Sequence, residues 1–348
     1  MRKSSAILLI TALLWLPAAL NGQLGGDNTY EFLNLPWSAR GSVLGGTIIS
    51  LADDDPSLLV CNPALAGSTM SGMLTLGYAS YLAGISFGSV HYVHQHSGNT
   101  TLAAGLNWLS YGSFIEANEA GAITGSFRAA EYAINIAGSR KIDTIFAVGV
   151  NLKPILSQLE SYTSVGFAVD IGGFVTSRDS TLTAGIVLRN IGMQLTTYAG
   201  ETREKIPFEI QAGISKKLPH APLRFSLTMR NLQKFNLTHD YDTIDFGGIT
   251  GSTDADAGFT EKLLRHALFG IECLPHRNFW VGAGYNYQRR SELRIENGGA
   301  AVGFSWGFGL NISGFRLAFS RATYHMAGGT TQFSLSLNPG SIYRKITN

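Results

Sequence analysis

The chain has 348 residues, of which only 14% are charged and 41 are glycine, and its formal net charge is +2. Ordinary globular domains carry about 25% charged residues, so this composition is unusual for a domain with a water-exposed surface. The basic residues are scattered and form no stripe, which leaves no electrostatic case for binding nucleic acid.

The N-terminus has the pattern of a secretory signal peptide. Arg2 and Lys3 precede an apolar run over residues 6–16, and small residues then lead to a cleavage region near Gly22. An N-terminal membrane anchor is the alternative, but the apolar run is shorter than the ~18 residues that a membrane helix needs. We therefore expect residues 1–22 to be a signal peptide and the protein to be exported.

Residues 23–69 show no regular alternation of apolar and polar side chains. Turn signals interrupt them, among which are a glycine pair at 45–46, the run Asp53–Pro56 and the pair Asn62–Pro63. We expect a segment that folds into one end of a larger structure, or caps it, as a plug on the periplasmic side. The alternative is a flexible periplasmic tail.

Beyond residue 70 large apolar residues recur at every second position. The clearest run consists of Val302, Phe304, Trp306, Phe308, Leu310 and Ile312. Such alternation indicates strands with one apolar and one polar face, and about 14 runs of this kind fill residues 70–338 before a tail over 339–348. A soluble β-sandwich shows alternation too, but here the polar face is rich in glycine and serine. A membrane protein without a long apolar helix must be a closed barrel, so we predict an all-β, antiparallel transmembrane barrel of about 14 strands.

The connections between these runs are sorted by length. Every second connection is short (96–99, 140–143, 178–180, 219–222, 275–278 and 313–314), whereas the long ones (113–126, 197–205 and 238–261) all fall in the other set. Outer-membrane barrels have short periplasmic turns and long outer loops, and a sandwich has no reason to sort its loops in this way. The pattern therefore predicts the bacterial outer membrane.

Few residues suggest chemistry. His91, His94 and His96 lie together beside a short turn, but no cysteine or carboxylate stands at ligand spacing, which favours a solvated cluster over a metal site. No catalytic motif is apparent, and we predict a non-enzymatic protein without cofactors. Cys61 and Cys273 could bridge in an exported chain, but Cys273 falls on the apolar face, so two free thiols are favoured.

Two further groups of charged residues are candidates for function. Charges on the polar face can pair across a narrow lumen and fill it; they are Asp170, Arg189, Glu209, Glu272 and Arg316. The longest loop is acidic but lacks the EF-hand spacing, so it is either a solvated loop or a docking surface for an extracellular partner. For that surface we single out Asp240, Tyr241, Asp242, Asp245, Phe246, Asp254 and Asp256.

The mature N-terminus resembles a known family. The stretch Tyr30–Pro36, followed by Ser38–Arg40 and Leu44–Gly46, resembles the PorQ-like barrels of the type IX protein secretion system. Asn62–Leu65 resembles the turn before the first strand of the wider FadL-like barrel group. The residues that carry these likenesses as a plug motif are Tyr30, Phe32, Leu33, Pro36, Asn62, Pro63 and Ala64. One departure is the C-terminus, which runs past Leu337 instead of ending on an aromatic residue.

The resemblance implies a role in the outer membrane. PorQ-like barrels hold the surface protein PorZ at the cell surface, together with the sortase-like PorU and the related barrel PorV. It therefore implies a non-enzymatic anchor with a PorZ-like partner, a PorU/PorV-like attachment complex and outer-membrane lipid around it. The alternative is a FadL-like channel for uptake of hydrophobic small molecules. A ligand pocket needs an apolar lining, and the polar inward positions favour the anchor. An outer-membrane hydrolase is a third, weaker hypothesis.

Overall fold

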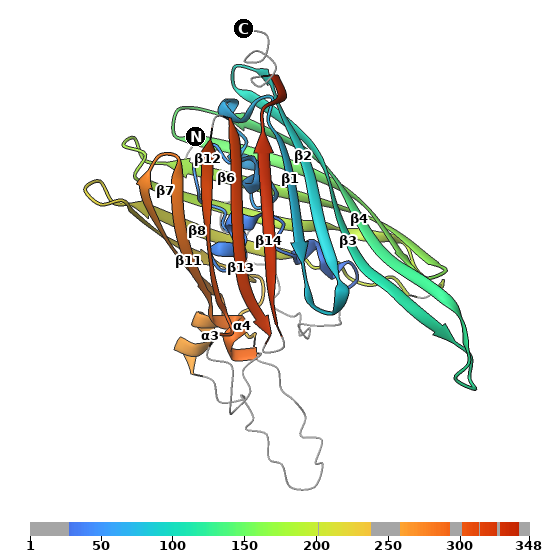
Figure 1. Cartoon of the computed structure of the whole chain (residues 1–348). Coiled ribbons are helices and arrows are strands. Elements are labelled where there is room, and N and C mark those ends of the chain that lie inside the picture. The colour runs from blue at the N-terminus through green and yellow to red at the C-terminus, as the bar shows by residue number, and fades with distance from the viewer. Residues whose placement is uncertain are drawn as a thin grey trace, which may run out of the picture.

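The computed structural model describes residues 28–200, 202–237, 258–292, 301–312, 314–325 and 328–340. Fourteen antiparallel strands close into one barrel in which each strand pairs with its neighbours in the chain and β1 pairs with β14 (Figure 1). The predicted fold class is confirmed. The strands are β1 (Leu74–Ser80), β2 (Ser86–Ser97), β3 (Thr100–Ala117), β4 (Ile123–Lys141), β5 (Phe146–Leu159), β6 (Tyr162–Thr176), β7 (Leu182–Thr196), β8 (Glu209–Lys217), β9 (Leu223–Met229), β10 (Ala267–His276), β11 (Phe279–Asn286), β12 (Phe304–Ile312), β13 (Phe315–His325) and β14 (Gly328–Leu337).

The alternation in the sequence places apolar side chains outside and small or polar ones inside. On β12 the outward Phe304 and Trp306 are 50% and 52% exposed, whereas Ser305 between them is buried at 3%. Because a slip of one residue would exchange the two faces, this pattern fixes the register, as in the pairing of Phe308 with Phe319. Among the described residues, no helix is both long enough and apolar enough to cross a bilayer.

The two ends of the barrel differ. One end, called here the turn end, carries the short connections 98–99, 142–145, 177–181, 218–222 and 277–278. The opposite end, the loop end, carries α3 (Phe259–Arg265) and α4 (Tyr287–Glu292). In Figure 1 the turn end is at the top and the loop end at the bottom. The expected signal peptide over 1–22 and the acidic loop residues between 240 and 256 lie outside the described residues, as do residues 341–348 of the tail.

One expected connection was wrong, and two alternating apolar runs extend past the ends of their strands. The stretch 113–126, expected as a loop, is mostly strand, because β3 continues to Ala117 and β4 begins at Ile123. The resulting hairpin projects outward from the barrel at the loop end (Figure 1). Apolar residues alternate from Ile206 onward, but β8 begins only at Glu209. The alternation along β11 likewise continues to Tyr287, where α4 begins. In these two cases the pattern runs past a boundary that is set by pairing with the neighbouring strand.

The residues before β1 lie inside the barrel, where Figure 1 shows them as blue ribbons behind β13 and β14. We call residues 28–73 the plug. It consists of short pieces, η1 (Glu31–Asn34), α2 (Ala39–Val43), η2 (Pro56–Val60), η3 (Pro63–Leu65) and η4 (Ser68–Met70), while η5 (Leu82–Gly84) joins β1 to β2. Side-chain caps start these pieces, since Ser38, Asp55 and Asn62 accept hydrogen bonds from the backbone two or three residues later.

Candidate functional site: the plugged lumen

The plug passes through the lumen from one end of the barrel to the other. At the loop end, the Thr29 amide donates to the Lys205 carbonyl at 2.8 Å, and the Tyr30 hydroxyl lies 2.5 Å from the Ser164 hydroxyl. At the turn end, the Gly72 amide donates to the Val93 carbonyl at 2.8 Å just before β1 begins. The segment is therefore an internal plug that reaches both mouths.

An apolar cluster lies in the loop-end half of the lumen. Phe32 and Trp37 of the plug pack edge to face with ring centroids 6.2 Å apart, and Trp37 packs in the same way on Phe87 of the wall at 5.3 Å. Leu109 and Ile155 of the wall complete this cluster and are 5% and 2% exposed. Phe87 faces inward although it is a large apolar residue, because β2 keeps one register over residues 86–95 and its odd-numbered positions all point into the lumen. The expectation of a polar lumen does not hold at this cluster, although charged side chains such as Glu209 are also buried at the loop end.

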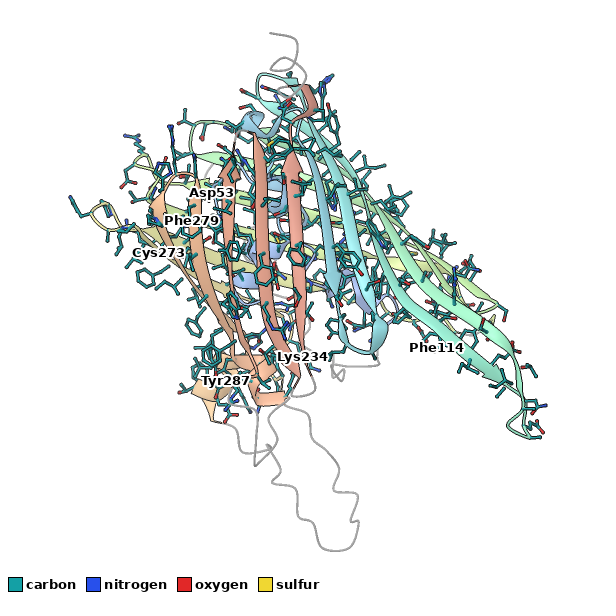
Figure 2. All side chains as sticks on the ribbon, in the orientation of Figure 1. Asp53, Phe114, Lys234, Cys273, Phe279 and Tyr287 are labelled. Carbon is teal, nitrogen blue, oxygen red and sulfur yellow. The ribbon has the colours of Figure 1, made fainter. Side chains whose placement is uncertain are left out.

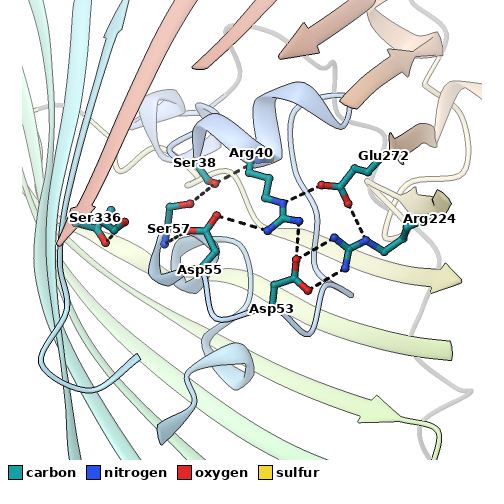
Figure 3. Close-up of polar contacts among 10 residues, drawn as sticks. Ser38, Arg40, Asp53, Asp55, Ser57, Arg224, Glu272 and Ser336 are labelled. Atoms are coloured by element: carbon teal, nitrogen blue, oxygen red, sulfur yellow. Dashed lines mark hydrogen bonds and ion pairs between the residues drawn. The ribbon is translucent and has the colours of Figure 1, made fainter. Parts of the chain in front are cut away.

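The turn-end half holds a network of charged side chains that joins the plug to the wall (Figure 3). We call Arg40, Asp53, Arg224 and Glu272 the clamp. Arg40 of α2 donates from Nε to Glu272 at 2.9 Å, and Arg224 donates from Nε to the other oxygen of Glu272 at 2.8 Å. Arg224 also donates from both Nη atoms to the two carboxylate oxygens of Asp53 of the plug, at 2.9 Å each. Two carboxylates and two guanidiniums thus alternate in a ring.

The clamp stays charged. Burial alone would raise the pKa of Asp53, but the guanidiniums of Arg40 and Arg224 hold that pKa well below its usual range. Burial opposes the charge of Arg40, yet Glu272 and Asp53 raise its pKa above the usual value. The guanidinium of Arg40 also lies 4.8 Å from the centroid of Trp280. Removing one member of such a buried network leaves an uncompensated charge, which is strongly unfavourable.

The charges predicted to pair across the lumen find partners closer by. Asp170 pairs with Lys153 of the adjacent strand at 2.6 Å, and Glu209 pairs with Arg230 at 2.7 Å. The Nη2 atom of Arg189 donates to the plug carbonyl of Leu33 at 3.2 Å. Of the other charges that were predicted to pair across the lumen, Glu272 belongs to the clamp and Arg316 lies at the turn-end mouth. The sequence interpretation missed Lys153, Arg224 and Arg40, although the first two share parity with inward neighbours.

Inward glycines give the plug its space. A Cβ atom on Gly149 would lie 2.4 Å from the backbone nitrogen of Ala64, and one on Gly284 would lie 2.4 Å from the nitrogen of Gly45. Real side chains do not tolerate such distances, so these wall positions accept the plug only as glycine. The high glycine content of the polar face is thus partly a consequence of the plug, which the alternation pattern by itself does not reveal.

A cavity of about 510 Å³ opens at the turn end beside the clamp. Figure 2 shows Asp53 in this region of the barrel. Its charged lining comes from the plug, from three strands and from the turn between β10 and β11; it comprises Arg40, Asp53, Asp54, Asp55, Lys217, Arg224, Arg277 and Arg316, with His276 beside them. The cavity is within the size range of sites for small molecules.

The residues of the predicted plug motif all lie in the lumen. Tyr30, Phe32, Leu33 and Ala64 are at most 3% exposed, and Pro36 and Pro63 are buried as well. Asn62 is fully buried; its side-chain amide donates to the Ile49 carbonyl at 2.9 Å and to the Gly173 carbonyl at 3.2 Å. The motif therefore lies where plug and wall meet. The predicted partner-binding residues of the acidic loop lie outside the described residues.

The remaining candidates are separate from this site. His91 points inward and hydrogen-bonds to Asn107 at 2.9 Å, whereas His94 and His96 are exposed on the outer face. Among the described residues, no group of three or more potential ligands could hold a metal ion. Cys61 is buried in the plug and Cys273 is half-buried on the wall, and both are free thiols, as predicted.

Comparison with known proteins finds similarity at the level of the fold. No protein-family model and no curated protein sequence matches this chain. Among solved structures, the CymD monoaromatic hydrocarbon channel is 12% identical with a TM-score of 0.52, covering 89% of this chain and 97% of its own. The Pseudomonas putida toluene transporter TodX is 12% identical with a TM-score of 0.50, covering 86% of this chain and 96% of its own. A TodX deltaS2 mutant is 13% identical with a TM-score of 0.51, covering 87% of this chain and 98% of its own. This chain has the barrel fold of these channels.

Proposed function

We propose that this protein is an outer-membrane channel of the FadL-like kind that takes up small hydrophobic compounds through a lumen closed by the plug. The observation that carries the proposal is the apolar cluster of Phe32, Trp37 and Phe87 beneath the loop end. Solved barrels of the same fold are described as channels for monoaromatic hydrocarbons, which supports the same class of compound here. The chain is proposed to be non-enzymatic.

The geometry suggests how a compound would enter. A hydrophobic molecule at the loop end can replace apolar contacts between plug and wall with contacts of its own, so little apolar surface becomes exposed to water. The plug then has to shift, because Trp37 and Phe87 fill the lumen at this level. The clamp at the other end ties the plug to the wall, so passage through the whole lumen also requires this tie to be released.

Uptake by the purified barrel in liposomes tests this proposal. We expect a small aromatic hydrocarbon to enter faster than through empty liposomes and a sugar of similar size to enter at the background rate. Phe87→Ala should change the hydrocarbon rate because it alters the lumen, whereas Phe333→Ala should not, since that ring is 54% exposed on the outer face. Equal rates with and without the protein would refute the proposal.

A second candidate function is the anchoring of a surface partner. The hairpin formed by the ends of β3 and β4 projects from the loop end and carries Phe114 (Figure 2). Phe114 and Phe127 stack with ring centroids 5.2 Å apart, and Ile115 and Ile123 are each 72% exposed. Together with the PorQ-like N-terminus, this projection favours a PorZ-like partner and a PorU/PorV-like complex.

Deletion of residues 240–258, and separately of the hairpin tip over 113–126, tests the anchoring role. Loss of a surface protein from intact cells, while the barrel stays folded and heat-modifiable on gels, is the expected result. A partner that remains on the surface of both deletion strains contradicts the anchoring role.

A further inference from the structure

The cavity at the turn end is separate from the apolar cluster at which the proposed uptake route begins. Its cations outnumber its carboxylates. Lys217, Arg277 and Arg316 line it, and among the described residues none of the three forms an ion pair. Lys217 and Arg277 are exposed, and Arg316 is half-buried. Three unpaired cations around an open cavity create a local excess of positive charge that attracts anions.

The floor of this cavity already holds a carboxylate. Asp53 is 30% exposed, and both of its oxygens accept from Arg224 in the paired geometry typical of arginine and carboxylate. The Nη2 atom of Arg40 forms an ion pair with Asp53 at 2.5 Å. Asp53 is thus the least buried member of the clamp, and both guanidiniums that hold it lie beside the cavity.

An apolar surface lies next to these charges. Trp280 points inward from β11 with one face against Arg40, and Leu274 lines the same cavity from β10. A ligand that matched this lining would carry a carboxylate at one end and an aromatic or aliphatic body at the other. The volume of about 510 Å³ accommodates a molecule of that kind.

We propose that this cavity is a binding site for a small organic carboxylate, whose carboxyl group replaces Asp53 on Arg224 and Arg40. The exchange never leaves the two buried guanidiniums without a carboxylate, which avoids the large cost of exposing an unpaired buried charge. Asp53 belongs to the plug, so binding at the cavity frees one of the ties that hold the plug to the wall. Because the two equilibria are linked, the factor by which binding favours release of the plug is also the factor by which release of the plug strengthens binding.

Calorimetry on the purified full-length barrel in lipid nanodiscs tests the site, with 2-naphthoate as the probe and the uncharged 2-naphthalenemethanol as its counterpart. We expect saturable binding of the carboxylate only. Lys217→Gln combined with Arg316→Gln should weaken binding about fivefold, as expected for partly exposed charge pairs. Lys216→Gln is the matched control, because Lys216 lies one residue away on the outer face and lines no part of this cavity.

The decisive variant is Asp53→Asn, which removes the competing carboxylate. If the ligand takes the place of Asp53, this change tightens 2-naphthoate binding about tenfold or more, the equivalent of one charge-assisted hydrogen bond. A variant that binds the probe no better than the unmodified protein, or a methanol counterpart that binds equally well, overturns the proposal. Retained heat-modifiability on gels establishes that the variant is folded.

A second measurement does not depend on that variant. In a Cys273→Ser background, 2-naphthoate should speed the alkylation of Cys61 in the plug, and the uncharged counterpart should not. Unchanged labelling with saturating carboxylate overturns the coupling to the plug. Both measurements are independent of hydrocarbon uptake. A negative result here therefore leaves the proposed channel function standing, and a negative uptake result leaves the proposed carboxylate site standing.

Discussion

The most informative single substitution is Glu272→Gln, which keeps the shape of the side chain and removes the wall's negative charge from the clamp. Glu272 accepts from Arg40 at 2.9 Å and from Arg224 at 2.8 Å while only 2% exposed. Each hydrogen bond to a charged group contributes about 1.5–3 kcal/mol, so two of them amount to about 3–6 kcal/mol. This agrees with the ~3–5 kcal/mol that follows from breaking a buried ion pair.

Alkylation of Cys61 reports this loss directly. The thiol is 5% exposed, and burial raises its pKa, so it reacts only when the plug leaves the lumen. A loss of about 3 kcal/mol in the tie between plug and wall corresponds to roughly a hundredfold increase in the open population. In a Cys273→Ser background we therefore expect Glu272→Gln to speed labelling by about two orders of magnitude.

The matched control is Glu261→Gln. Glu261 pairs with Arg265 at 2.9 Å within α3, at the opposite end of the barrel, and its side chain is 37% exposed. Exposed pairs of this kind contribute about 0–1 kcal/mol, so labelling of Cys61 should change less than about fivefold. If Glu272→Gln labels no faster than this control, the clamp does not hold the plug and the reasoning fails.

Three further predictions concern the same plug. Gly149→Ala should displace the plug and destabilise the protein by about 1–3 kcal/mol through overpacking. Gly138→Ala is the control, because its Cβ would lie 3.6 Å from its nearest neighbour, and it should leave thermal stability unchanged. Equal melting temperatures for the two variants contradict this prediction. Trp37→Ala should cost about 3–5 kcal/mol by chemical denaturation, and a loss under about 1 kcal/mol would show that the ring is not packed as described. The folded pKa of Asp53 lies below its unfolded value, so its contribution is complete above about pH 3.9 and is lost only as the pH falls further toward the folded pKa. The protection of plug amides against hydrogen exchange, corrected for intrinsic rates, should accordingly be constant from pH 7 to 4 and fall below pH 4. The Asp53→Asn variant should not show this fall.

The barrel could be predicted from the sequence because strand alternation is a local property. Each strand's two faces meet different surroundings, so a pattern of period two specifies both the strand and its orientation. The prediction failed where that contrast disappears. Phe87 is a large apolar residue that faces inward, because Trp37 of the plug packs against it, so its apolar character does not identify its face.

The plug was harder to derive, because its contacts are non-local. Arg40 and Glu272 are 232 positions apart in the chain, and no periodicity links a short helix to the strand that it contacts. The inward glycines were visible as a composition, but their reason, the approach of Ala64 and Gly45 to the wall, needs the path of the plug. Arg224 could have been found by extending the inward parity of β9 from Thr228 and Ser226.

Locking the plug in place tests the central claim that hydrophobic compounds pass only when it moves. In a background without the native thiols, Ser50→Cys with Ser215→Cys joins plug to wall where the two hydroxyls lie 2.7 Å apart. Thr75→Cys with Ser336→Cys joins β1 to β14 across hydroxyls 2.8 Å apart and serves as the control lock. The account predicts that the oxidised plug lock abolishes hydrocarbon uptake into liposomes, that a reductant restores it, and that the control lock leaves it intact. Undiminished uptake through the oxidised plug lock would contradict the account.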